Sequence, residues 1–74
     1  MLFVMKIKTI IATNIRNHRK RLHLTLERAA ERAGMTVNYW QRLELVSQSD
    51  LPSFPTLFRI AKALSIKASQ LLEE

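Results

Sequence analysis

The only glycine of the chain, Gly34, lies between two short stretches that each follow a threonine. Thr25 and Thr36 are interpreted as N-cap residues, because a threonine hydroxyl can accept a hydrogen bond from the backbone of a helix's first turn. Glycine readily adopts the left-handed conformation that ends many helices. We therefore predict two short helices, at about residues 26–33 and 37–45, joined by a tight turn at Gly34.

The rest of the sequence also favours helices over strands. Apolar residues recur at near-helical spacing over residues 7–22, and this stretch should end at His23, since histidine tolerates a positive φ better than most residues. Ser53 is expected to cap a fourth helix, Ser65 to end it, and a last short helix is expected at about residues 68–73. One glycine and two prolines are too few for the many turns of a β-sandwich or barrel. We therefore predict a compact all-α fold of five helices.

A chain of 74 residues has room for one small core. We divide it into an apolar N-terminal extension, residues 1–8, and a single domain, residues 9–74. The extension is interpreted as a continuation of the first helix or a short strand at a dimer contact, or else as a loosely packed terminus. The residues predicted to form the core are Ile11, Ile15, Leu24, Ala30, Met35, Trp40, Leu43, Leu57, Ile60, Leu64 and Leu71.

The chain is strongly basic, with 12 Lys and Arg residues against 6 Asp and Glu residues and a net charge of +6. Such an excess attracts nucleic acid, an acidic partner or an anionic membrane surface. Cysteine is absent, so disulfides and thiolate metal sites are excluded, and His18 and His23 lie on different parts of the pattern. No apolar stretch approaches the ~20 residues of a membrane span. The acidic residues form no convincing catalytic pair, so we expect no enzyme activity, no metal and no cofactor.

The segment from Thr25 to Leu45 has the features of a helix-turn-helix. Two helices that cross steeply need small residues at the crossing and a glycine in the turn. The second helix also needs one apolar face for the core and one polar face for solvent or a ligand. The residues expected to face inward are Ala30, Gly34, Met35, Trp40 and Leu43, and those expected to face outward are Val37, Asn38, Gln41 and Arg42.

The order and spacing of these residues resemble the lambda-repressor and Cro-like (XRE) helix-turn-helix family, over roughly residues 11–72. The first matching residues are Ile15, Arg16, Arg19, Leu24, Thr25, Ala29, Ala30, Ala33, Gly34, Met35, Thr36, Trp40, Leu43 and Glu44, and the match continues through residues 52–57, 60–64, Leu71 and Leu72. Members of the family are mostly bacterial or phage transcription regulators that bind operators as dimers. The resemblance thus implies a cytoplasmic, DNA-associated regulator of repressor type that binds double-stranded DNA as a homodimer.

The resemblance also implies roles for residues of the second helix of the pair. Thr36, Val37, Asn38 and Arg42 occupy positions where relatives contact bases or nearby phosphates. An arginine such as Arg42 can donate two hydrogen bonds to a guanine, and Asn38 can pair with an adenine. Val37 offers apolar contact, for example to a thymine methyl group. The full set of DNA-binding candidates is Thr36, Val37, Asn38, Tyr39, Gln41, Arg42, Thr25 and Arg19.

Four residues carry structural expectations as well. By resemblance, Arg19 and Glu44 occupy the positions of an ion pair that orients the recognition helix, and Arg19 can also approach a phosphate. Tyr39 is expected either at the DNA backbone or as a partly buried packing residue. His18 takes a position that leucine usually fills, so it is interpreted either as a satisfied, half-buried histidine or as a pH-sensitive part of the core.

The sequence departs from the family's pattern at several positions. Leu26 replaces a glutamine that in many relatives anchors the second helix to a phosphate. His23 and Val46 replace glycines, Leu45 and Val46 replace polar residues beside the backbone contact zone, and the loop to Pro52 is longer than usual.

These departures leave two alternatives beside an operator-binding regulator. One is an antitoxin-type autorepressor that also binds a toxin. The other is a protein-interaction module that kept the fold and lost operator recognition. The apolar residues Leu26, Val37, Leu45 and Val46 favour the second alternative, because they would make the surface unusually apolar for a groove-reading protein.

Overall fold

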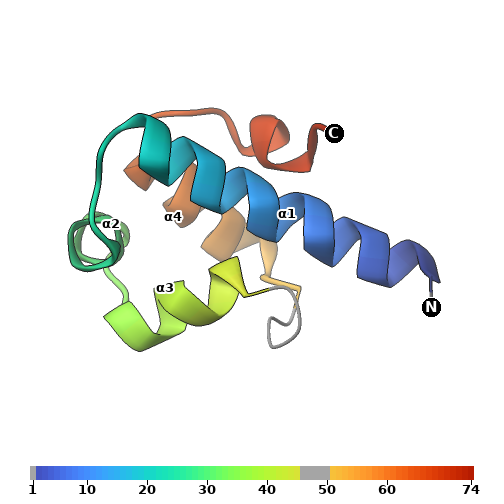
Figure 1. Ribbon diagram of the computed structural model, residues 1–74, viewed down its shortest axis with the longest axis horizontal. Helices are drawn as coiled ribbons and strands as arrows, with labels where there is room; N and C mark the ends of the chain where they lie inside the picture. The colour runs from blue at the N-terminus through green and yellow to red at the C-terminus, as the bar shows by residue number, and fades with distance from the viewer. Residues whose placement is uncertain (1, 46–50) are drawn as a thin grey trace.

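The computed structural model describes the backbone of residues 2–45 and 51–74, and the side chains from Lys6 onward within those ranges. The elements of the described residues are α1 (Leu2–Arg21), α2 (Leu26–Ala33), α3 (Val37–Glu44), α4 (Phe54–Ala63) and the 3₁₀ helix η1 (Ala68–Leu72), with no strand among them. α1 is the longest element, and its N-terminal end projects past the other helices (Figure 1). α3 and η1 both pack on α1 but on different sides of it. The predicted all-α fold is confirmed.

The ends of the helices differ from the expected ones at both termini of the chain. α1 begins at Leu2 rather than near residue 7, so the apolar start of the sequence continues the first helix. Residue 8, where we separate an extension from the domain, therefore lies inside α1. α3 ends at Glu44, one residue before the expected end, and Leu45 is its C-cap.

The last helix was expected over about residues 68–73, but the structure has a short 3₁₀ turn there and only four α-helices among the described residues. Two polar side chains hold this segment in place. Gln70 turns back so that its side-chain oxygen accepts from the Lys67 backbone N–H at 2.9 Å, which tightens the first turn. Asn14 of α1 donates to the carbonyl oxygens of Leu71 and Glu73, at 2.8 and 2.7 Å, and so ties this segment to α1.

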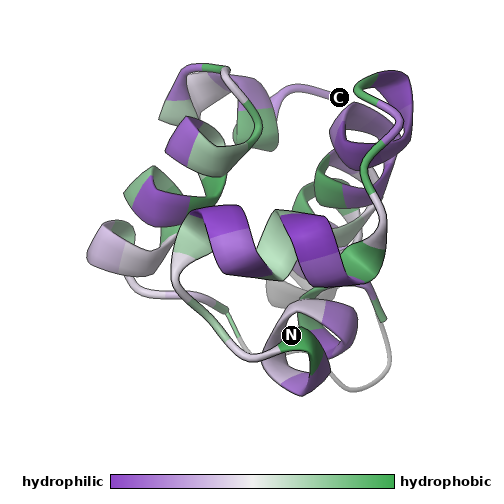
Figure 2. Cartoon of the chain, turned by 90° about the vertical axis from the view of Figure 1, so that its left-hand side faces the viewer, coloured by the Kyte–Doolittle hydropathy of each residue, from purple (hydrophilic) through white to green (hydrophobic). Residues whose placement is uncertain are grey.

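The core lies where α1, α2, α3, α4 and η1 meet. All the residues predicted for it are buried except Leu24 and Met35, which are partly buried and pack against it. The small residues of α2 are buried as well, so α2 can pack closely on both α3 and α4. In Figure 2, α2 crosses the middle of the view and turns its hydrophilic residues outward.

The turn between α2 and α3 depends on the backbone of Gly34. Its φ is 68° and its ψ is 37°, a left-handed conformation that favours glycine. The Met35 N–H donates to the Ala30 carbonyl at 2.9 Å and the Gly34 N–H to the Glu31 carbonyl at 3.1 Å, so these two carbonyls at the end of α2 are satisfied. Gly34 itself is exposed, so its predicted inward position is wrong, and its contribution is to the backbone. His23 ends α1 in the same way, with the expected positive φ of 58°.

Candidate nucleic-acid interface

α3 has one buried and one exposed face. Trp40 and Leu43 are buried in the core. Successive residues of an α-helix are rotated by about 100°, so Asn38, Gln41 and Arg42, which are all exposed, fall together on the opposite face. Amide and guanidinium groups in this arrangement can hydrogen-bond the edges of base pairs. The structure thus brings three of the candidate residues onto one accessible surface.

Two other candidates on α3 lie away from the centre of this surface. Val37 is predicted to face outward. In the structure it is the first residue of α3, is partly buried, and packs against the core. Tyr39 is 37% exposed and is rotated to the flank of the helix. Val37 and Tyr39 therefore border the outward face rather than form it.

Thr25 and Thr36 are exposed at the first turns of α2 and α3. The Thr25 hydroxyl oxygen accepts from the Arg28 N–H at 3.1 Å, and the Thr36 hydroxyl oxygen accepts from the Tyr39 N–H at 3.2 Å. Both threonines are therefore N-caps, as predicted. A hydroxyl that accepts in this way keeps its own proton to donate, so each cap can still bind an anionic oxygen.

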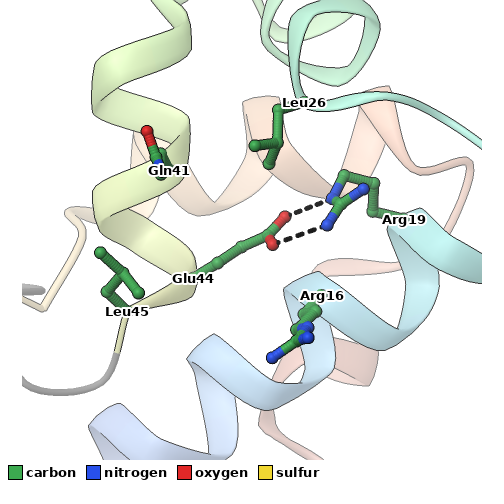
Figure 3. A pocket seen from close by; sticks show the side chains of 6 residues that line it. All are labelled: Arg16, Arg19, Leu26, Gln41, Glu44 and Leu45. Carbon is green, nitrogen blue, oxygen red and sulfur yellow. Dashed lines mark hydrogen bonds and ion pairs between the residues drawn. The ribbon is translucent and has the colours of Figure 1, made fainter.

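An ion pair joins α1 to the C-terminal end of α3. Arg19 donates from Nε to Glu44 Oε2 at 2.6 Å and from Nη2 to Glu44 Oε1 at 3.0 Å (Figure 3). The side chains are only 13% and 7% exposed, and the hydrogen bonds to Glu44 raise the pKa of Arg19 above its ordinary value. A bidentate pair of this kind fixes both distance and orientation.

Two more groups complete this network. The Trp40 indole Nε1 donates to Glu44 Oε2 at 2.6 Å, and Arg19 Nη1 donates to the Leu24 carbonyl at 2.9 Å. The Glu44 carboxylate therefore accepts hydrogen bonds from Arg19 of α1 and from Trp40 of α3 itself. Arg19 also binds the segment that leads into α2. We call Arg19, Glu44 and Trp40 the α1–α3 network. Arg19 uses three of its five N–H donors within the protein, so two can still reach a phosphate.

Arg59 of α4 holds the turn of the helix-turn-helix, and sequence reasoning missed it. Its Nε donates to the Ala33 carbonyl at 3.1 Å and its Nη2 to the Gly34 carbonyl at 2.6 Å. These carbonyls lie at the C-terminal end of α2, where a cation is favoured. Local spacing gives no sign of the contact, because the partners are 25 and 26 residues apart.

A shallow cleft of about 240 Å³ lies between α1, the start of α2 and α3 (Figure 3). Its lining residues are Arg16, Arg19, Leu26, Gln41, Glu44 and Leu45. Leu26 stands where many relatives have a phosphate-binding glutamine, and it forms an apolar part of this cleft together with Leu45. The cleft therefore lies beside the outward face of α3, which shares Gln41 with it.

His18 lies in the last turn of α1, next to Arg19 in the sequence, and is half-buried. Burial lowers the pKa of His18, the nearby positive charge of Arg21 lowers it further, and Glu73 acts in the opposite direction. Arg21 Nη2 lies 3.1 Å from His18 Nδ1, and because an arginine can only donate, Nδ1 must accept. Both observations favour a neutral imidazole in the folded protein.

The sequence of residues 10–73 matches the family of helix-turn-helix domains, which is most of the chain. The protein therefore belongs to this family, and its resemblance to the XRE and Cro-like type is confirmed. It carries a helix-turn-helix domain of a DNA-binding class. A search of curated protein sequences found no significant match.

Two further properties concern the described residues alone. None of their helices is long and apolar enough to cross a membrane. Across the same residues, no three His, Cys, Asp or Glu side chains are grouped so that they could hold a metal ion.

Proposed function

We propose that the protein is a sequence-specific transcription regulator that binds double-stranded DNA as a homodimer and docks α3 in the major groove. The observation that carries the proposal is the outward face of α3, where Asn38, Gln41 and Arg42 are exposed. The major groove admits one α-helix and presents a distinct pattern of donors and acceptors for each base pair. The net charge of +6 supplies the attraction to phosphates that such docking requires.

In this proposal α3 provides the sequence specificity. Arg42 donates two hydrogen bonds to a guanine, Asn38 pairs with an adenine, and the exposed part of Val37 contacts a thymine methyl group. Gln41 lies beside them and can reach a further base edge. The residues proposed to contact the phosphate backbone are Arg19, Thr25, Thr36 and Tyr39.

The dimer follows from the way helix-turn-helix proteins read palindromic sites, one half-site for each protomer. Two surfaces are proposed for the contact between protomers. One is η1, where Leu72 is 50% exposed. The other is the apolar N-terminal extension, residues 1–8.

The experiment that tests this function is binding to random duplex DNA from ~50 to ~200 mM salt, followed by selection of the bound sequences. We expect affinity to fall steeply with salt, because bound phosphates release their counterions. Selection should yield a defined sequence. An absence of binding even at the lowest salt would contradict the proposal.

Arg42→Ala tests the direct reading of bases on the selected sequence. We expect a loss of ~1–3 kcal/mol on that sequence and little change on random DNA, because the guanine contact exists only at the specific site. Equal losses on both DNAs would make Arg42 a phosphate contact. Arg42→Lys is the matched variant, since it keeps the charge and cannot form the planar bidentate pair.

One observation favours the alternative of a protein-interaction module. Phe54 and Phe58 lie one turn apart on α4 and are 75% and 62% exposed, and Leu51 beside them in sequence is 43% exposed. Exposed apolar groups of this kind mark interaction sites when they are contiguous. In an antitoxin-type autorepressor this surface would bind the toxin while α3 binds DNA. Two results together would replace the DNA-binding regulator with the protein-interaction module. They are an absence of DNA binding and a loss of binding to a purified partner in the double variant Phe54→Ser, Phe58→Ser.

A further inference from the structure

We infer that the cleft between α1 and α3 binds one phosphate group of the DNA backbone, with Arg16 as its counter-charge. The inference rests on the proposed function, because it needs α3 to be docked on a duplex. It adds a residue to the interface that neither the sequence pattern nor the family resemblance assigned to DNA.

The charges around the cleft leave one cation unbalanced. Arg19 and Glu44 neutralise each other through their bidentate pair. Arg16 lines the same cleft and is exposed, and among the described residues its side chain has neither a hydrogen bond nor an ion pair. The cleft therefore carries the net charge of one guanidinium, which is the group best matched to a phosphate in shape and number of donors.

The position of the cleft matches the path of a DNA strand. Gln41 belongs both to the outward face of α3 and to the cleft wall (Figure 3). When that face enters the major groove, the sugar–phosphate strand that borders the groove has to pass along the flank of α3. On this flank the strand meets Arg16 of α1 and the side-chain amide of Gln41, which can donate to the same phosphate.

The apolar part of the cleft fits the same occupant. Leu26 and Leu45 line it beside the charged group. A deoxyribose presents apolar C–H surface next to its phosphate, and the exclusion of water by two leucines strengthens the interaction between the guanidinium and the phosphate.

The size of the cleft argues against a small-molecule effector. Its volume of about 240 Å³ is below the ~300–1,000 Å³ of ordinary ligand pockets. Its walls come from α1, α2 and α3 (Figure 3), but the cleft is too shallow to enclose a free small molecule. A phosphate that belongs to a long duplex needs no such enclosure, because the other contacts of the duplex hold it in place.

The test compares the salt dependence of DNA binding for the wild type, Arg16→Gln, Arg16→Lys and Lys67→Gln. Each phosphate contact contributes about 0.9 to the slope of log affinity against log salt, so Arg16→Gln should lower that slope by ~0.9. Its affinity deficit should therefore shrink ~3.5-fold between ~50 and ~200 mM salt, equally on selected and random DNA. Arg16→Lys keeps the charge and should keep the slope.

Lys67→Gln is the control, because it removes one charge from the side of the molecule that carries η1, away from α3 (Figures 1 and 2). It should leave the slope close to that of the wild type. An unchanged slope in Arg16→Gln overturns the inference, and so does an equal drop in Lys67→Gln. A loss confined to the selected sequence would make Arg16 a base-reading residue and overturns it too.

Two further arms separate other causes of failure. Absence of salt-dependent binding by the wild type overturns the proposed function itself and the inference with it. Titration of the free protein with inorganic phosphate, followed by Trp40 fluorescence, distinguishes a free anion from the duplex backbone. Saturable binding that Arg16→Gln abolishes would assign the cleft to a free anion and overturn the inference.

Arg16→Gln should melt like the wild type, since Arg16 has no partner among the described residues.

Discussion

Glu44 connects α3 both to α1 and to the buried indole of Trp40. It accepts from Arg19 on α1 and from the indole of Trp40, at 2.6 Å in each case for its Oε2. With 7% of the Glu44 side chain exposed, water contributes little to its solvation. This carboxylate therefore orients α3 against α1 in addition to their shared apolar core, which is the physical reason to expect an acid at this point.

Glu44→Ala is expected to destabilise the fold by ~3–5 kcal/mol, because it leaves the Arg19 guanidinium half-buried without its counter-charge. Trp40 loses the acceptor for its indole N–H at the same time. Chemical unfolding followed by Trp40 fluorescence measures the effect. In the double variant with Arg19→Met and Glu44→Ala, part of the loss should be recovered, since no unpaired charge remains. An unchanged free energy of unfolding in Glu44→Ala would remove the α1–α3 network from any structural role.

His18 predicts a pH dependence of stability. Burial and Arg21 lower the pKa of His18 below its ordinary value of 6.5, so the unfolded chain binds a proton at a higher pH than the folded one. Stability therefore rises with pH across this interval, and it is lost as pH falls from about 6.5 toward the lowered pKa. Thermal melts should show a midpoint that drops by a few degrees over this range. In His18→Leu the drop should disappear, and a drop that persists would belong to another group.

At the scale of the elements, the turn between α2 and α3 has two supports. Gly34 provides the left-handed backbone, with φ of 68°, and Arg59 binds its carbonyl from α4 at 2.6 Å. The two supports interact, because a Cβ on residue 34 would lie 3.1 Å from Arg59 Nη2. A side chain at this position thus disturbs both the backbone conformation and the contact from α4.

Gly34→Ala should cost ~1–3 kcal/mol of stability, because alanine is strained in the left-handed region and crowds Arg59. Gly34→Asn is the matched variant, and it should cost less, since asparagine adopts this conformation more readily. Urea unfolding of both variants gives the comparison. An alanine variant as stable as the wild type would mean that the turn can adopt another conformation.

The elements also explain which parts of the fold were predictable. Thr25, Thr36 and Gly34 act on backbone groups within a few residues, so their sequence neighbours suffice to predict α2 and α3. Val37 packs inward because the core lies below the first turn of α3, a fact of tertiary packing that helical periodicity does not contain. The attachment of η1 to α1 involves Asn14, which is 57 residues away from Leu71 in the sequence.

The candidate site follows the same rule. The outward face of α3 was predictable, because the positions of Asn38, Gln41 and Arg42 relative to Trp40 follow from the helical repeat alone. The part played by Arg59 and the cleft at Arg16 were not, since each depends on side chains from two or more elements. A guanidinium reaches several ångströms from its backbone, so its partners are set by the packed fold and not by local spacing.

At the scale of the whole molecule, size limits how much DNA one copy can read. The domain measures 33 × 23 × 21 Å, and the helix proposed to read DNA, Val37–Glu44, is short. Such a helix reaches only a few base pairs, and each good contact discriminates by ~1–3 kcal/mol. One protomer alone therefore has too few contacts for a unique site in a genome, whereas two protomers related by a two-fold axis double them.

The selected DNA sequence should therefore be an inverted repeat, with half-site centres ~34 Å apart, which is about one turn of the duplex. Inserting half a turn between the half-sites should abolish tight binding, because the second α3 would then face away from the groove. Inserting a full turn should leave each half-site on the same face of the duplex. Titration with sedimentation or native mass spectrometry should give two protomers for each site. A single, unrepeated site bound by one protomer would contradict the dimer, while leaving the major-groove docking of α3 intact.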